Sequence, residues 1–236
     1  SVDIFLILRY TTTMNFSSRP EQDPADLPPE IILASQSVGR RQLLEQLGIR
    51  FRVIVTHVDE SHIMDKDPLN LLKRRSIAKA EELIANPRIY NLPEEGKALI
   101  IAADSMAIRG KKTYGKPNDE ADARQILREL MGKMHIFATA TCIVLIEAGK
   151  ETKRWTNVTQ TKVTMNTLKP ADFELYIHRY DFSRYAAAYA LNDAPWTLIS
   201  KIEGSYTNVI GLPFEELLPI LKKLKIIELP AHVQSK

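Results

Sequence analysis

The hydrophobic positions along this chain follow two patterns. Short continuous apolar runs, such as Ile31-Ile32-Leu33-Ala34, are typical of strands covered on both faces, whereas apolar residues three and four apart are typical of helices with one buried side. Continuous and alternating runs predict strands at 31–34, 51–56, 98–103, 135–146, 154–165 and 196–202. Three-and-four spacing predicts a helix that ends at Gly48, one over 68–84, one capped by Asn118, one that begins at Pro170, and one over 213–226. A hairpin is predicted at 147–150 and a loop at 204–212, so that helices and strands alternate around a β-rich middle.

The first predicted strand and helix have the layout of an anion site. The turn between them holds Ser35, Ser37 and Gly39, and the first helical turn brings Arg40 and Arg41. The first N–H groups of a helix have no partner inside the helix, and its dipole favours negative charge there. Because guanidinium groups bind phosphate through two N–H groups at once, this stretch predicts a binding site for a polyphosphate.

Three further charged groups stand at strand ends or in turns. The pairs Asp59-Glu60 and Asp104-Ser105 each follow a predicted strand, and a glycine and a proline flank Lys116 in Gly115-Lys116-Pro117. Lys79 lies on the helix after Glu60. In open α/β sheets the ligand crevice lies outside the carboxyl ends of the strands, where these groups would meet.

Carboxylates beside several cations indicate a phosphate substrate with a divalent metal, Mg²⁺ or Mn²⁺, because such metals prefer one or two carboxylates plus phosphate oxygens. Glu60 and Asp104 would bind the metal or activate a water molecule. The cations that would neutralise charge on the phosphates are Arg40, Arg41, Lys79 and Lys116. Each group alone is equally typical of an ordinary turn or cap. All of these groups suit the binding of phosphate and a divalent metal, and together they favour a single phosphate site.

Composition narrows the class of protein. A net charge of +3 with dispersed Lys and Arg does not indicate nucleic-acid binding, and no apolar run is long enough to cross a membrane. The single cysteine, Cys142, lies in an apolar run and fits a buried thiol in a reducing compartment, so we expect a cytoplasmic protein. His57 and His62 lack the further ligands that zinc needs and are interpreted as solvated loop residues. We expect a leader over 1–28, one domain over 29–228 and a tail over 229–236.

These motifs together resemble the Maf-type nucleoside triphosphate pyrophosphatases, relatives of the inosine-triphosphate pyrophosphatases. The family pattern S-x-S-P-R-R-x-x-L-L followed by a glycine corresponds to 35–48, and its second arginine falls on Arg40. The other motifs keep their order and spacing. They are Val58-Asp59-Glu60, Ala78-Lys79-Ala80, Ala103-Asp104-Ser105, Gly115-Lys116-Pro117 and the closing Glu203-Gly204-Ser205-Tyr206-Thr207-Asn208-Val209-Ile210-Gly211-Leu212-Pro213.

The resemblance implies a mixed, twisted α/β sheet with flanking helices and two lobes around a deep nucleotide cleft. It implies hydrolysis of the α–β phosphoanhydride of a nucleoside triphosphate to a monophosphate and pyrophosphate, with Asp104 as proton acceptor and Glu60 as a metal or water-orienting residue. Ser35, Arg40, Lys79 and Lys116 would hold the triphosphate. Some members of the family are linked to arrest of septum formation, and members are often dimeric, which is compatible with a homodimer here.

Departures from the family pattern bear on the substrate. Val38-Gly39 replaces Pro-Arg, which removes one cation, and Ala187 stands where the family has glycine. Three positions that separate subgroups of the family are Gly39, Ser105 and Asn192. The last two are close to the Thr and Gln of the dTTP/UTP group, which we favour. A different base, including 7-methyl-GTP, and a nucleotide-binding regulator of cell division that has lost most turnover remain as alternatives.

Overall fold

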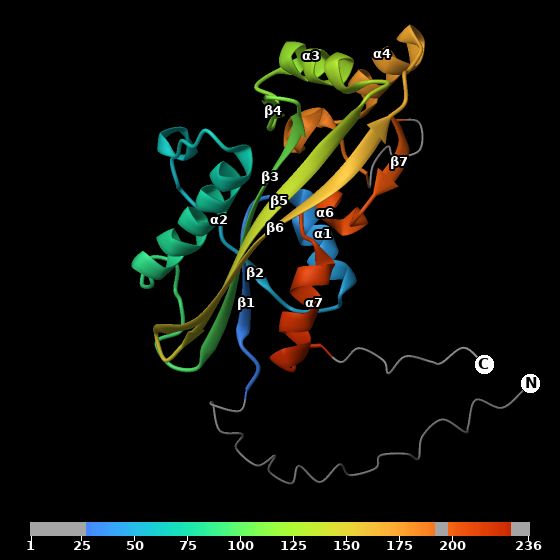
Figure 1. Cartoon of the computed structure of the whole chain (residues 1–236). Coiled ribbons are helices and arrows are strands. Elements are labelled where there is room, and N and C mark those ends of the chain that lie inside the picture. Colours follow the sequence, from blue (N-terminus) through green and yellow to red (C-terminus); the bar gives the residue numbers. More distant parts are fainter. Residues whose placement is uncertain (1–26, 192–197, 228–236) are drawn as a thin grey trace, which may run out of the picture.

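A computed structural model describes residues 27–191 and 198–227 of the chain. One seven-stranded mixed sheet runs in the order β2-β1-β3-β5-β6-β7, and β4 pairs with β3 outside this path (Figure 1). The elements are, in chain order, β1 (Glu30–Ala34), α1 (Val38–Gln46), β2 (Arg52–Val53), η2 (Glu60–His62), α2 (Pro68–Ala85), β3 (Lys97–Arg109), β4 (Lys112–Tyr114), α3 (Glu120–Leu130), β5 (Met134–Glu147), β6 (Lys150–Met165), α4 (Pro170–Arg179), η3 (Phe182–Arg184), η4 (Ala186–Ala188), β7 (Ile199–Glu203), α6 (Tyr206–Ile210) and α7 (Phe214–Lys223).

The parallel part of the sheet is covered on both faces. β1 pairs in parallel with β2 and with β3, and its side chains alternate between two cores. Ile31 and Leu33 lie in the core shared with α1 and α7, whereas Ile32 and Ala34 lie in the core shared with α2. Burial on both sides explains why this strand and the first half of β3 are continuous apolar runs. Cys142 is buried in the second of these cores, as predicted.

Three long antiparallel strands carry the sheet into a second lobe. β3, β5 and β6 extend past the parallel part, and Figure 1 shows α3 and α4 at their far end. A separate core there combines α3, α4, η4 and the far parts of β3, β5 and β6. The expected α/β fold with two lobes is therefore confirmed, and the long strands join the lobes by continuous backbone hydrogen bonding.

Three expected strands have different bounds. The strand expected at 154–165 begins at Lys150, because Lys150 and Glu151 already pair with the end of β5. β3 does not end at Ala103 but continues through Asp104 and Ser105 to Arg109, because Asp104 stays paired with Ala140 and Ser105 with Thr139 on β5. The strand expected at 51–56 is only two residues long, because its partner β1 ends at Ala34 and the chain turns into α1. Glu60 therefore follows an extended loop instead of a strand end.

Smaller corrections concern caps and a missed helix. The side chain of Asp119, not Asn118, caps α3 by accepting a hydrogen bond from the Asp122 N–H. The expected loop at 204–212 contains α6, whose five residues are too few to show a helical period. β7 begins at Ile199, and the start expected at Trp196 lies outside the described residues.

The expected leader and tail also lie almost wholly outside the described residues. Across residues 27–191 and 198–227, the structure contains no helix that combines the length and the apolar character needed to cross a membrane.

Candidate active site

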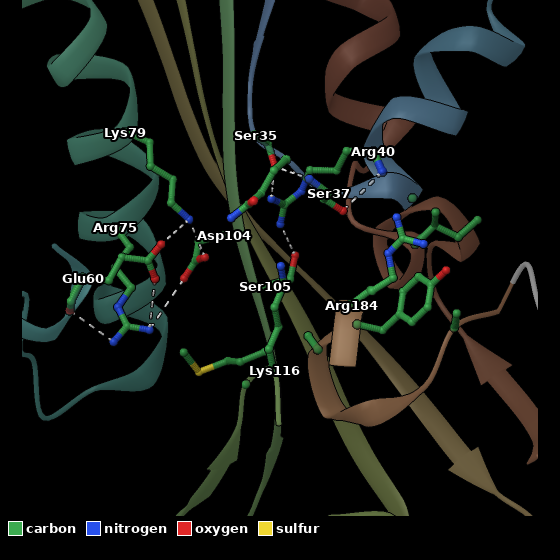
Figure 2. Close-up of a pocket in the computed structure, with 18 of the residues that line it drawn as sticks. Ser35, Ser37, Arg40, Glu60, Arg75, Lys79, Asp104, Ser105, Lys116 and Arg184 are labelled. Carbon is green, nitrogen blue, oxygen red and sulfur yellow. Dashed lines mark hydrogen bonds and ion pairs between the residues drawn. The ribbon is translucent and has the colours of Figure 1, made fainter. Parts of the chain in front are cut away.

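The two lobes enclose a cavity of about 370 Å³. Its walls come from the β1–α1 turn, the middle of β3, the η2–α2 segment, the turn after β4, the η3–η4 segment and α6. Figure 2 shows Glu60, Arg75 and Lys79 on one side, Arg40 and Arg184 on the other, and Asp104 and Ser105 between them.

Lys79 joins the two acidic residues of the site. Its Nζ lies 2.8 Å from Glu60 Oε1 and 2.8 Å from Asp104 Oδ1. Lys79 is only 9% exposed, and a cation so deeply buried is stable only when it is paired. Helix α2 supplies this lysine, and Asp67 and Pro68 fix where that helix begins. The site therefore holds two carboxylates within reach of one ammonium group.

Arg40 is held in place on three sides. Its Nε donates to the carbonyl oxygen of Gly211 at 2.9 Å, Nη1 to Ser35 Oγ at 2.9 Å, and Nη2 to Ser105 Oγ at 2.8 Å. Burial lowers the pKa of Arg40, and the charges of Asp104 and Glu60 oppose that effect. Because guanidinium groups stay protonated in proteins, Arg40 is a fixed cation at the start of α1.

Two glycines allow α1 and α6 to approach each other here. A Cβ atom at Gly39 would lie 2.8 Å from the carbonyl oxygen of Ile210. Gly211 has a φ of 126°, and a Cβ atom there would lie 3.2 Å from Arg40 Nε. A larger residue at either position would push α6 away from Arg40. The close packing of α1 against α6 therefore requires a glycine at position 39, where the family pattern has an arginine.

A buried polar network supports Ser105 from behind. Ser105 Oγ lies 2.9 Å from Thr139 Oγ1, and Thr139 donates to the carbonyl oxygen of Asn208 at 3.0 Å. Asn208 Nδ2 in turn donates to the Phe137 carbonyl oxygen and to Thr161 Oγ1. Because Thr139, Thr161 and Asn208 are buried and bonded, Ser105 and Arg40 form one rigid unit with the sheet.

Lys116 enters the cavity from the turn after β4. Burial lowers the pKa of Lys116, and the nearby charges of Arg40 and Lys79 lower it further. The N–H of Ala187 donates to the Gly115 carbonyl oxygen at 2.7 Å, so the turn is fastened to η4 on the opposite wall. Lys116 is therefore a solvent-accessible cation at the cavity wall whose charge is easier to remove than that of an ordinary lysine.

Most of the predicted site residues meet in this cavity. They are Ser35, Ser37, Gly39, Arg40, Glu60, Lys79, Asp104, Ser105 and Lys116. Arg41 does not join them. It points about 100° away from Arg40 around α1 and pairs with Glu45 at 3.5 Å, and both side chains are more than half exposed. Asn192 lies outside the described residues. His57 and His62 are exposed, as expected of solvated loop histidines.

Sequence reasoning missed two arginines that line the cavity. Arg75 stands one helical turn before Lys79, so the i, i+4 spacing on α2 could have placed it on the same face. Arg184 comes from η3, which is too short to show a periodic pattern in the sequence. With Arg40, Lys79 and Lys116, the described lining holds five cations against the two acids Glu60 and Asp104.

The donor set fits a divalent metal that shares its ligands with phosphate. Within the described ranges there is no group of three or more His, Cys, Asp or Glu side chains that could bind a metal by themselves. Glu60 and Asp104 nevertheless converge, since one oxygen of each lies 2.8 Å from the same Lys79 Nζ. Two carboxylates completed by phosphate oxygens and water are the arrangement that Mg²⁺ usually takes.

The fold and the cavity together define a class, an α/β protein with a cationic cleft that contains a carboxylate pair. Residues 30–224 match the family model described as "Maf-like protein". The chain therefore belongs to the Maf family.

Two curated relatives match the chain over nearly all of their own length. The chain is 32% identical to a dTTP/UTP pyrophosphatase of Treponema denticola over 82% of this chain and 96% of the relative. It is 33% identical to a dTTP/UTP pyrophosphatase of Dictyoglomus thermophilum over 83% of this chain and 96% of the relative. A solved nucleoside-triphosphatase / dITP/XTP pyrophosphatase from Mycobacterium abscessus is 12% identical with a TM-score of 0.33, covering 64% of this chain and 93% of that one.

Proposed function

We propose that this protein hydrolyses nucleoside triphosphates to the monophosphate and pyrophosphate. The observation that carries the proposal is the Glu60–Lys79–Asp104 cluster, in which two carboxylates share one ammonium group at 2.8 Å beside a strongly cationic cavity. A carboxylate that can take a proton and cations that can receive phosphate charge are the two requirements of anhydride hydrolysis.

In this reaction the oxygen of a water molecule forms a bond to the α-phosphorus, and the bond from that phosphorus to the α–β bridging oxygen breaks. The proton of the water passes to Asp104, whose Oδ1 is already turned to Lys79. Arg40 and Lys116 neutralise charge on the departing pyrophosphate, and Lys79 keeps the carboxylate of Asp104 oriented.

Glu60 and Asp104 would hold a divalent metal, Mg²⁺ or Mn²⁺, which would polarise the phosphate oxygens when bound. The remaining ligands would be phosphate oxygens and water, as is usual for Mg²⁺.

For the base we propose a pyrimidine, with dTTP and UTP as the preferred substrates. The relatives from Treponema denticola and Dictyoglomus thermophilum carry that activity in their names. Ser105 stands at the subgroup position that is a threonine in that group, and it is fixed in the cavity by Arg40 and Thr139. Gly39 stands where the family has an arginine, and Ile210 leaves no room for a side chain there. A panel of bases tests whether this difference changes the preferred substrate.

The test is pyrophosphate release from a panel of canonical and modified nucleoside triphosphates, with Mg²⁺ or Mn²⁺ and an EDTA control. We expect metal-dependent release that is fastest with dTTP and UTP. Release from another base, such as 7-methyl-GTP, would keep the chemistry and overturn the pyrimidine preference. Nucleotide binding without release from any substrate would favour the regulator instead of the enzyme.

A further inference from the structure

Arg75 faces the carboxylate pair from the side opposite to Lys79. Its Nη1 lies 3.7 Å from Glu60 Oε2 and 3.9 Å from Asp104 Oδ2, and its Nη2 donates to the Glu60 carbonyl oxygen at 3.5 Å (Figure 2). Lys79 takes the other oxygen of each carboxylate. The charges of the two acids and the two cations therefore balance, and each cation faces one oxygen of each carboxylate.

The oxygens that face Arg75 are those that a metal would need. Mg²⁺ binds carboxylate oxygens at about 2.0–2.1 Å and holds its ligands in strict octahedral geometry. A cation at that distance from Glu60 Oε2 or Asp104 Oδ2 would stand beside the guanidinium of Arg75 with no anion between them. Metal and guanidinium thus compete for the same two oxygens.

The contacts that keep Arg75 at the carboxylates are weak. Both ion-pair distances exceed the length of a hydrogen bond, and the buried Nε has no hydrogen-bond partner. A buried N–H without a partner costs free energy, and a phosphate group could accept two hydrogen bonds from the same guanidinium. The described lining carries a formal excess of three positive charges, which attracts a polyphosphate and repels a free divalent cation.

We propose that Arg75 is the resident counter-cation of Glu60 and Asp104, and that it leaves them for the phosphates when nucleotide binds. A divalent cation then reaches the carboxylates together with the nucleotide and binds the nucleotide-free site only weakly. This inference rests on the proposed function, because it takes Glu60 and Asp104 to be the metal ligands.

The experiment measures two affinities of the full-length protein separately. Mn²⁺ binding without nucleotide is followed by electron paramagnetic resonance, and binding of inorganic triphosphate is followed by calorimetry in EDTA. The variant is Arg75→Met, which keeps an unbranched side chain as far as the position of Nε and removes the charged end of the guanidinium. The control is Lys73→Met, which removes one charge from an exposed position of the same helix. Glu60→Gln tests whether the bound Mn²⁺ belongs to the carboxylate pair.

We expect Arg75→Met to bind Mn²⁺ at least tenfold more tightly and triphosphate at least threefold more weakly than the wild type. A merely structural arginine would not move the two affinities in opposite directions. Unchanged affinity for Mn²⁺, or a loss of both affinities, would overturn the proposal, as would Mn²⁺ binding to Arg75→Met that Glu60→Gln leaves intact. Failure of the proposed function would show differently, as no pyrophosphate release by the wild type from any substrate in the panel.

Discussion

Replacement of Asp104 should lower the rate of hydrolysis and leave the fold intact. In Asp104→Asn the amide oxygen can still accept the hydrogen bond from Lys79, and Glu60 remains 2.8 Å from that ammonium group. We therefore expect a folded protein with an unchanged thermal midpoint and a kcat lowered by about a thousandfold, since positioned proton acceptors contribute roughly 10²–10⁴-fold. Pyrophosphate release and circular dichroism check the two halves of this prediction. A folded variant with near-normal turnover would exclude Asp104 as the proton acceptor.

Lys116 should contribute to binding of the triphosphate, and KM for the triphosphate should therefore depend on pH. Lys116→Ala should raise KM for the triphosphate about tenfold and change kcat much less, because one cation is lost from the proposed phosphate site. The lowered pKa of Lys116 means that its positive charge disappears at a lower pH than that of an ordinary lysine, so KM should rise as the pH increases. Lys116→Arg keeps its charge and should flatten that rise. Steady-state kinetics at several pH values test this, and an unchanged KM in Lys116→Ala would place the side chain in solvent.

At the scale of elements, η4 holds alanine in a backbone conformation that suits glycine. Ala187 has a φ of 59° and is fully buried in the core that contains α3, α4 and η4. Left-handed backbone costs an L-residue roughly 1–2 kcal/mol, so Ala187→Gly should stabilise the protein by about 1 kcal/mol. The matched control is Ala78→Gly in the middle of α2, which should instead destabilise by about 1 kcal/mol. Urea unfolding measures both, and equal signs for the two variants would refute the argument from strain.

The elements also show what could be predicted from the sequence. The apolar half of β3 and the helical spacing of α2 were evident, because burial on both faces or on one side leaves a clear pattern. The extension of β3 beyond Ala103 was hidden, because Asp104 and Ser105 are polar where the strand borders the cavity. The sequence predicts Arg41 in the site because it shares the first turn of α1 with Arg40, but the two side chains point to different sides of the helix.

At the scale of the whole molecule, the cavity depends on three cores that share β3 and β5. One core contains α1 and α7, another contains α2, and the third contains α3, α4 and η4, and the cavity is lined from elements of all three. The order of motifs in the sequence could identify the family and most of the lining. It could not place Arg184 or Tyr189 in the lining, because both depend on how η3 and η4 fold back over the sheet.

The stability of the molecule as a whole should decline on mild acidification because of His135. This histidine is 1% exposed, its Nε2 lies 2.8 Å from the hydroxyl of the cavity-lining Tyr189, and burial lowers its pKa to about 4. The unfolded chain takes up the proton near the ordinary pKa of about 6.5, whereas the folded chain does so only near 4, so stability is present above pH 6.5 and is lost as the pH falls. The expected loss between pH 7 and pH 5 is roughly 2 kcal/mol in the free energy of unfolding, before most carboxylates titrate. Urea unfolding at the two pH values should show this loss in the wild type and in the exposed-histidine control His178→Gln, and should show much less of it in His135→Gln. The same loss in His135→Gln as in the wild type would assign the acid sensitivity to other groups.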